Sequence, residues 1–359
     1  MIEKLWREIL GNRRNPLFSP LLFILWVVSL VYRLGLYLNS LMTSKALKLE
    51  VPVISVGNLT LGGTGKTPMV IEIARYFIKK GKSVGIASSG YGRRAKDQIA
   101  GTGREIAAHG PAMVGDEILM MAERLPEVLF AVAETKTEAA RLLVAKHQPD
   151  LILIDDGFQH RRLARDIDLL LIDATGDIRK EPLFPLGRRR EPLSAIKRAD
   201  LVILTRAEAK TAERFEWVKE KYGKETVAVS FAWMAVKSDR ESFPLEPLAE
   251  KPVYIFAGVG NFDALRIEAM ARFKNIRQFR RFPDHCRYDR GEQVTIRKDI
   301  EQFQPEFVIT THKDYVKLRG FDFGIPIYYL EMDIRYPVEQ EALYEFLSET
   351  LLKKYGKKI

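Results

Sequence analysis

Residues 60–68 read "TLGGTGKTP", and Gly65, Lys66 and Thr67 stand in the order of a phosphate-binding loop. The usual pattern G-x-x-x-x-G-K-[ST] places a glycine five residues before Gly65, where this chain has Thr60. The apolar run 51–56 before the loop predicts a buried strand. The apolar residues of 68–80 fall on one helical face. A loop between a strand and a helix is the context that phosphate binding requires, so we predict a nucleotide site here.

The residue types of this loop suit a triphosphate and its metal ion. Glycines at 62, 63 and 65 let backbone N–H groups approach the phosphates, and the helix N-terminus adds partial positive charge. Lys66 is expected to reach the β- and γ-phosphates, and the Thr67 hydroxyl to ligate Mg²⁺. The alternative is a glycine-rich turn with an incidental lysine. The predicted nucleotide-binding residues are Thr60, Gly62, Gly63, Thr64, Gly65, Lys66 and Thr67.

Strand and helix patterns alternate from residue 51 onward, which predicts an α/β protein with a mostly parallel sheet. A polar stretch with three prolines, 237–252, separates a second set of such patterns. We therefore expect a P-loop NTPase-like sheet with helices on both faces, and a second, smaller α/β domain. The expected domains are an N-terminal membrane-associated helix (1–45), a kinase core (46–240) and the smaller domain (241–359). The predicted strands are 51–56, 83–87, 128–133, 150–155, 167–173, 200–205, 226–231, 252–257, 307–311 and 326–330, and the predicted helices are 68–80, 115–125, 135–147, 207–222, 261–273, 290–303 and 338–353.

The N-terminal segment differs from the rest because residues 15–32 carry no charge. Eighteen helical residues span about 27 Å, slightly less than a hydrocarbon core of about 30 Å. Arg33 interrupts the apolar run, and the aromatic residues Trp26, Tyr32 and Tyr37 are typical of a membrane interface. We interpret the segment as a membrane anchor that spans the bilayer or lies at its surface. A signal peptide and a buried core helix are the alternatives.

Two acidic motifs accompany the loop. In "LILIDDGFQH" (151–160), four apolar residues place Asp155 and Asp156 at the end of a predicted strand, where a carboxylate can hold Mg²⁺. Asp116 lies in "VGDE" (114–117), where an aspartate near the phosphates could accept a proton from an attacking hydroxyl. In both motifs the aspartates could instead cap a helix. His285 in "FPDH" could be a structural histidine rather than a functional one. The arginines of "GRRREP" (187–192) could form a solvated basic turn or bind a phosphate or carboxylate.

Composition narrows the functional class. The chain has 57 basic and 47 acidic residues, a net charge of +10, which suits an anionic partner such as a phospholipid surface, a phosphorylated substrate or nucleic acid. One cysteine excludes an intrachain disulfide, and five histidines make a multi-histidine metal cluster unexpected. No nucleic-acid-binding motif accompanies the charge, so we expect no nucleic-acid partner.

Several motifs together resemble the tetraacyldisaccharide 4′-kinases of lipid A synthesis. The order along residues 51–285 carries the resemblance, and Thr60 belongs to that family's form of the loop. Two positions depart from the family pattern: Ser89, where we expect arginine, and His312, where we expect glutamate. The matching motifs are "SVGNLTLGGTGKTP", "GYGRR", "VGDE", "DDGFQHRRL", "REPL", "FAGVGN" and "FPDH".

The resemblance implies an ATP- and Mg²⁺-dependent kinase at the cytoplasmic face of the Gram-negative inner membrane. It implies transfer of the γ-phosphate to the 4′-hydroxyl of an acylated glucosamine disaccharide 1-phosphate. The implied catalytic residues are Asp116 as base, His285 as its partner across a domain cleft, and Lys66. The implied metal ligands are Thr67, Asp155, Asp156 and Glu191, and the implied substrate residues are Tyr91, Arg161 and Arg188.

A membrane-associated P-loop NTPase or GTPase with another role is the main alternative function. A guanine-binding protein usually carries [NT]-K-x-D. In "THKD" (311–314), Lys313 and Asp314 are adjacent, so this stretch lacks the required spacing.

Overall fold

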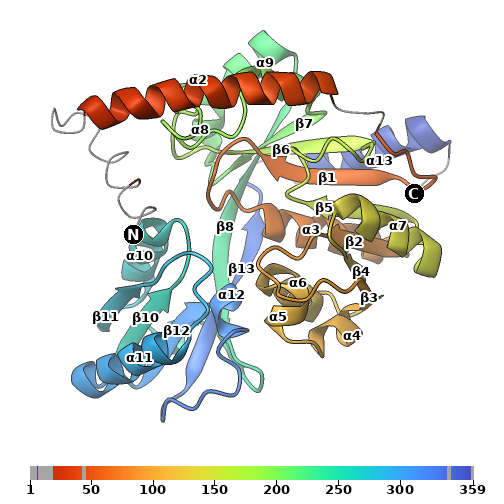
Figure 1. The fold of residues 1–359 in the computed structure, drawn as a ribbon. Helices are drawn as coiled ribbons and strands as arrows, with labels where there is room; N and C mark the ends of the chain where they lie inside the picture. Colours follow the sequence, from red (N-terminus) through yellow and green to blue (C-terminus); the bar gives the residue numbers. More distant parts are fainter. Residues whose placement is uncertain (1–5, 7–18, 43–45, 338–340, 357–359) are drawn as a thin grey trace. The chain divides into compact units, whose positions relative to one another are not determined.

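The computed structural model describes residues 6, 19–42, 46–337 and 341–356 (Figure 1). The chain forms two compact units. Each unit is built from segments that are distant in sequence. The first comprises Met1–Lys66, Asp156–Val229 and Pro337–Gly356, and the second comprises Thr67–Asp155 and Ser230–Tyr336, with Lys357–Ile359 outside the described residues.

Parallel strands form the centre of the first unit. β6 (Ile167–Asp173) pairs with both β1 (Val53–Asn58) and β7 (Leu201–Thr205), and β7 pairs with the first residues of β8 (Thr226–Lys237). β1 and β7 are buried along their whole length, as expected for apolar parallel strands covered on both faces. The carboxyl ends of parallel neighbours lie at one edge, so the loop after β1 emerges beside the ends of β6 and β7.

Helix α2 (Ser19–Met42) belongs to the first unit and is longer than the sequence predicts. It continues through Arg33, so its 24 residues span about 36 Å rather than about 27 Å. Figure 1 shows it as one uninterrupted helix. Its segment Ser19–Asn39 has a mean hydropathy of 2.1 and is long and apolar enough to cross a membrane. Only 6% of this segment is buried, which does not fit the alternative of a buried core helix.

Two groups of strands form the second unit. The first group has the order β5 (Leu151–Asp155), β2 (Val84–Ser88), β4 (Leu129–Val132) and β3 (Ile99–Thr102), with only the β3–β4 pair antiparallel. The second has the order β11 (Ile276–Arg281), β10 (Val253–Ala257), β12 (Phe307–Thr311), β13 (Ile327–Arg335) and β8. Its members are parallel except for β13 and β8, and β9 (Ser242–Phe243) pairs with β8. The predicted mostly parallel α/β fold is therefore confirmed.

Helices α3, α6, α7, α10, α11 and α13 lie close to their predicted positions, whereas the short helices α4, α5 and α12 were not predicted. Residues 338–340 of the predicted last helix, and residues 15–18 of the predicted membrane segment, lie outside the described residues. The helices are α3 (Lys66–Lys79), α4 (Gly103–Ala107), α5 (Pro111–Val114), α6 (Asp116–Arg124), α7 (Lys136–His147), α8 (Ala209–Ala212), α9 (Glu216–Tyr222), α10 (Phe262–Arg272), α11 (Arg290–Phe303), α12 (His312–Tyr315) and α13 (Glu341–Tyr355), with 3₁₀ turns η2 (Leu193–Arg198), η3 (Glu213–Phe215) and η4 (Glu246–Leu248).

Several sequence-based expectations need correction. The predicted helix 207–222 is divided into α8, η3 and α9, because Phe215 leaves helical geometry and packs into the core. The strand predicted at 226–231 continues to Lys237, since its second half pairs with β13. Strands β3, β9 and β11 were not predicted. β11 contains three arginines in six residues and lies at a sheet edge, where polar residues are tolerated.

Candidate active site

The loop 57–67 connects β1 to α3 and is held in place by the chain around it. Asn58 and Thr64 are buried, and the Asn58 amide donates a hydrogen bond of 2.9 Å to the Thr64 hydroxyl. The Leu61 N–H donates to the Arg188 carbonyl at 2.7 Å, and Thr60 forms a bridge with Arg189. Thr60 is thus part of a paired backbone segment that does not require glycine.

Two glycines of the loop have conformations that other residues adopt only with strain. Gly62 and Gly65 have φ angles of +111° and +86°. An added Cβ at Gly62 would meet nothing within 4 Å, so backbone conformation rather than crowding favours glycine there. Positive φ angles turn successive N–H groups toward a common point, which is the arrangement that surrounds a phosphate.

Lys66 and Thr67 begin α3, and each contacts one of the two aspartates at the end of β5, Asp155 within the strand and Asp156 directly after it. The Thr67 hydroxyl donates to Asp155 Oδ2 at 3.1 Å, and Lys66 Nζ lies 3.5 Å from Asp156 Oδ1. Arg190 also contacts both Asp156 carboxylate oxygens, at 3.0 and 2.9 Å. The two aspartates therefore have different partners, a hydroxyl for Asp155 and two cations for Asp156.

This donor set fits a magnesium ion that also binds phosphate oxygens. Among the residues that the structure describes, no group of three or more His, Cys, Asp or Glu side chains could hold a metal. Mg²⁺ is usually held by one or two carboxylates together with water and substrate phosphates. The Thr67 hydroxyl beside the buried Asp155 carboxylate supplies oxygen ligands of this kind.

Glu191, another predicted metal ligand, is surrounded by arginine and glutamine side chains. It is buried, and its carboxylate accepts hydrogen bonds from Arg161 (2.9 Å), Arg198 (2.9 and 3.0 Å) and Gln159 (3.1 Å). Burial by itself raises the pKa of Glu191, but the Arg198 hydrogen bond and charge, with help from Gln159 and Arg161, lower it overall. Two guanidinium partners disfavour a third cation at this carboxylate. Arg188 contacts Glu181 at 3.6 Å and is more than half exposed.

Asp116 and His285 lie together in the second unit. His285 Nδ1 is 3.3 Å from Asp116 Oδ2. Gly115 precedes Asp116 with φ +92° and ψ 150°, a conformation open almost only to glycine, and this turn starts α6 at Asp116. Tyr91 is 70% exposed, and its ring lies edge-on to the His285 ring with the centroids 5.0 Å apart. The structure thus brings together three of the residues that the resemblance implied.

Two lysines complete this cluster, and the sequence patterns did not reveal them. Lys317 Nζ lies 3.4 Å from Asp116 Oδ2, and Lys313 Nζ lies 3.1 Å from His285 Nε2. Burial alone would raise the pKa of Asp116. The His285 hydrogen bond and the charges of Lys313, Lys317 and His285 lower the pKa to about 2 instead. Asp116 is therefore ionised at neutral pH.

Lys313 also determines which His285 nitrogen carries a proton. Burial by itself lowers the pKa of Lys313, but four carboxylates, Glu117, Asp284, Asp116 and Asp314, raise it overall. An ammonium group can only donate, so His285 Nε2 must accept from Lys313. The Nδ1 proton then faces Asp116.

Comparison with known proteins identifies the family of this chain. A family model described as tetraacyldisaccharide-1-P 4′-kinase matches residues 21–352. The tetraacyldisaccharide 4′-kinase of Pelobacter propionicus is 34% identical over 328 residues, 88% of either chain. That of Geobacter sulfurreducens is 33% identical over 358 residues, 96% of this chain and 98% of the relative. The chain belongs to the tetraacyldisaccharide 4′-kinase family.

A solved structure of the family shares the fold. The crystal structure of the "apo" form of LpxK from Aquifex aeolicus in complex with ATP matches with a TM-score of 0.74 and 30% sequence identity. The match covers 92% of this chain and 99% of that chain. The resemblance inferred from the motifs is therefore confirmed, as is the fold class of this tetraacyldisaccharide 4′-kinase family member.

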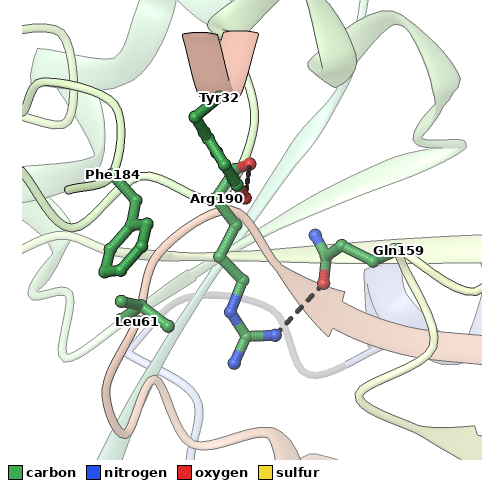
Figure 2. Close-up of a pocket in the computed structure, with 5 residues that line it drawn as sticks. All are labelled: Tyr32, Leu61, Gln159, Phe184 and Arg190. Carbon is green, nitrogen blue, oxygen red and sulfur yellow. Dashed lines mark hydrogen bonds between the residues drawn. The ribbon is translucent and has the colours of Figure 1, made fainter. Parts of the chain in front are cut away.

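A cavity of about 260 Å³ lies between α2 and the nucleotide loop in the first unit (Figure 2). The Tyr32 hydroxyl donates to the Arg190 carbonyl at 2.9 Å, and the Arg190 guanidinium donates to Gln159 at 3.2 Å. Leu61 and Phe184 provide apolar walls. The cavity thus combines a cation, an amide and apolar surface beside the apolar helix.

His312, one of the two departures from the family pattern, is a buried structural residue. Its Nε2 lies 2.8 Å from Glu123 on α6, and its ring stacks on Tyr329 with the centroids 4.0 Å apart. Burial lowers the pKa of His312 even though the Glu123 hydrogen bond and charge oppose this effect. His312 precedes Lys313 in α12. Its contact with Glu123 therefore joins α12 to α6, the helix that begins at Asp116.

Proposed function

We propose that this family member transfers the γ-phosphate of ATP to the 4′-hydroxyl of tetraacyldisaccharide 1-phosphate in lipid A biosynthesis. Membership of the family makes the chain an ATP-dependent 4′-kinase, and the loop 57–67 is the expected ATP site. The observation that carries the residue assignment is the 3.3 Å contact between the ionised Asp116 and His285.

We assign the base to Asp116. Its carboxylate accepts the proton of the 4′-hydroxyl while that oxygen bonds to the γ-phosphorus and the bond to the β-phosphate oxygen breaks, releasing ADP. His285 orients Asp116 through its Nδ1 proton. A carboxylate with a pKa of about 2 is a weak base. Proton transfer is therefore expected to occur late, when the phosphoryl bond to the 4′-oxygen has largely formed.

The phosphate groups are assigned to the nucleotide loop. They are bound by the backbone of Gly62, Gly63 and Gly65 and by the Lys66 ammonium group. On binding ATP, Lys66 would leave its contact with Asp156 and contact phosphate oxygens instead. Thr67 and Asp155 would hold Mg²⁺, which supplies charge neutralisation on the β- and γ-phosphates when bound. Asp156 and Glu191 remain predicted ligands, although their arginine partners favour an anchoring role.

The acceptor is assigned to Tyr91, Arg161 and Arg188. Tyr91 lies at the His285 ring, where it can contact the sugar. Arg161 and Arg188 remain the predicted partners of the substrate phosphate. The cavity between Tyr32 and Arg190 has the apolar and cationic lining that an acylated sugar phosphate requires.

We place the enzyme at the cytoplasmic face of the inner membrane, where ATP and a membrane-bound acceptor meet. The exposed apolar surface of α2 supports membrane association. One side of α2 contacts the rest of the first unit through Ser29 and Tyr32. We therefore favour a helix that lies at the membrane surface over one that crosses the bilayer.

Phosphate transfer from labelled ATP to tetraacyldisaccharide 1-phosphate in detergent micelles with Mg²⁺ tests the function. We expect transfer by the wild type, none by Lys66→Ala, and a loss of about 10²- to 10⁴-fold for Asp116→Ala. Near wild-type turnover of Asp116→Ala would remove its assignment as base. Absence of transfer by the wild type, with tight GTP binding, would favour the alternative of a membrane-associated GTPase.

A further inference from the structure

Tyr32 connects the apolar helix α2 to the chain segment that ends at Arg190. Its hydroxyl donates to the Arg190 carbonyl at 2.9 Å, and Figure 2 shows this contact beside the cavity. Burial raises the pKa of Tyr32, and the Glu191 charge adds to this effect while Arg190 opposes it. The hydroxyl therefore keeps its proton near neutral pH and remains a donor. Ser29, one turn earlier in α2, donates to the Leu183 carbonyl at 3.3 Å, so the helix holds this segment at two points.

The same segment is paired with the nucleotide loop. The Arg190 N–H donates to the Leu59 carbonyl at 2.6 Å, and the Leu61 N–H donates to the Arg188 carbonyl at 2.7 Å. Because these are backbone hydrogen bonds, a displacement of Arg190 would displace the loop with it. Helix α2, this segment and the start of the nucleotide loop therefore form one continuous set of contacts within the first unit.

The Arg190 side chain determines which cation the Asp156 carboxylate retains. Arg190 Nη1 lies 3.0 and 2.9 Å from the two Asp156 oxygens, whereas Lys66 Nζ lies 3.5 Å from Oδ1. Lys66 has to leave Asp156 in order to reach the phosphates of ATP. The departure of a cation from a partly buried carboxylate costs less free energy when a second cation remains beside that carboxylate. Arg190 is that second cation.

We propose that Tyr32 is a positioning residue of the nucleotide site, which holds the Arg190 backbone so that the Arg190 guanidinium retains Asp156 while Lys66 moves to the phosphates. This inference rests on the ATP-dependent kinase function proposed above. It gives α2 a second role, because the helix that carries the exposed apolar surface also stabilises the ATP-bound form of the loop.

The first test measures the binding of a fluorescent ATP analogue with Mg²⁺ to the full chain in detergent micelles, without acceptor. Tyr32→Phe removes the hydroxyl and keeps the ring. We expect its affinity for the analogue to be about two- to tenfold weaker than that of the wild type, the range that the loss of one hydrogen bond produces. Tyr37→Phe is the matched control, since Tyr37 lies on the same helix and is 60% exposed. Its affinity should equal that of the wild type.

A double-mutant cycle tests whether Tyr32 acts through Arg190. Arg190→Met removes the guanidinium and keeps the backbone carbonyl to which Tyr32 donates. If Tyr32 positions that guanidinium, Tyr32→Phe should weaken ATP binding by less than about twofold in the Arg190→Met background. An equal loss of affinity in both backgrounds would overturn the proposal, as would an unchanged affinity of Tyr32→Phe in the wild-type background.

Transfer kinetics separate this role from direct contact with the acceptor. We expect the KM for ATP to rise in Tyr32→Phe while the KM for tetraacyldisaccharide 1-phosphate stays unchanged. A rise in the acceptor KM alone would show that Tyr32 contacts the acceptor and would overturn the proposal. A wild type that binds ATP without transferring phosphate would contradict the proposed kinase function, whereas the binding cycle would still decide the role of Tyr32.

Discussion

At the residue scale, the acid–base cluster depends on which partners surround each titratable group. Asp116 is a buried carboxylate that stays ionised because His285, Lys313 and Lys317 surround it. Lys317 is in turn held by Asp314 at 3.2 Å and by the Cys286 carbonyl at 2.9 Å. The fully buried Asp314 also accepts from the Gly258 N–H at 2.9 Å. The "FAGVG", "FPDH" and "THKD" stretches thus form one site.

Lys313 is expected to act as a positioning residue through His285. Lys313→Met removes the donor to Nε2, so the His285 proton can move to that nitrogen and Asp116 loses the hydrogen bond from His285. We expect kcat to fall about ten- to a hundredfold while the KM for ATP changes little.

Lys313→Arg provides the matched comparison because it keeps a permanent donor. It should retain more activity than Lys313→Met, and ¹⁵N chemical shifts of the His285 ring should report the Nδ1–H form in the wild type and in Lys313→Arg. A wild-type ring with its proton on Nε2 would contradict the tautomer assignment.

At the element scale, α6 is joined to α12 and to the residues that follow it by a hydrogen bond and an ion pair distant from the reacting atoms. Glu123 contacts both His312 and Arg319, and Arg319 also contacts Asp239 at 2.6 Å. Arg124, the last residue of α6, donates to the Met332 carbonyl at 3.0 Å. These contacts hold the C-terminal end of α6 against β13 and α12. Because Asp116 begins the same helix, they also help to position Asp116.

Stability should depend on pH through His312. Burial lowers its pKa in the folded state below the ordinary value of about 6.5, so the unfolded state binds more protons in this interval. The free energy of unfolding should therefore decrease as pH falls below about 6.5.

His312→Gln keeps a hydrogen-bond donor for Glu123 but cannot titrate. Denaturant unfolding of both proteins between about pH 7.5 and pH 5 should show a smaller decrease for the variant. Parallel curves for the two proteins would indicate that His312 does not carry this dependence.

Helix α2 is expected to bind membranes through its exposed residues and not through the side that contacts the first unit. Val31 and Leu34 are 65% and 57% exposed. Burying each of these side chains in the membrane contributes about 1.5–3 kcal/mol of binding free energy, which glutamine does not supply. Vesicle binding of the double variant, measured by co-sedimentation, should therefore be more than tenfold weaker.

Ile267→Gln is the control, since Ile267 is 70% exposed on α10, outside the apolar helix. Its vesicle binding should equal that of the wild type. Equal binding by the Val31/Leu34 variant would show that α2 is not the membrane contact.

At the scale of the whole molecule, the net charge of +10 predicts an electrostatic contribution to membrane binding. Screening shortens the Debye length from about 30 Å at about 0.01 M salt to about 3 Å at about 1 M. Binding to phosphatidylglycerol vesicles should therefore weaken strongly over this range, and binding to phosphatidylcholine vesicles should change little. A similar salt response on both lipids would contradict this expectation.

The expected boundaries at residues 45/46 and 240/241 stay predictions. The first rests on the end of the apolar N-terminal segment and the second on the polar, proline-containing stretch 237–252. Limited proteolysis within 237–252 is the measurement that tests the second boundary.

The sequence by itself determined the fold class, the nucleotide loop and the family. These features depend on neighbours in the chain. Apolar periodicity sets strands and helices, and the spacing of Gly62, Gly65, Lys66 and Thr67 sets the loop. The family motifs also singled out Asp116 and His285.

Only the tertiary structure decided what surrounds these groups. Lys313 and Lys317 belong to no spacing rule that identifies them as site residues, because their partners are far away in sequence. Lys317 meets Asp116 across about 200 residues. Such contacts follow from the order in which strands pair. A local pattern specifies which side chains are present and which face they occupy, but the pairing of distant strands determines which charges meet, and therefore which carboxylate remains ionised and which nitrogen carries a proton.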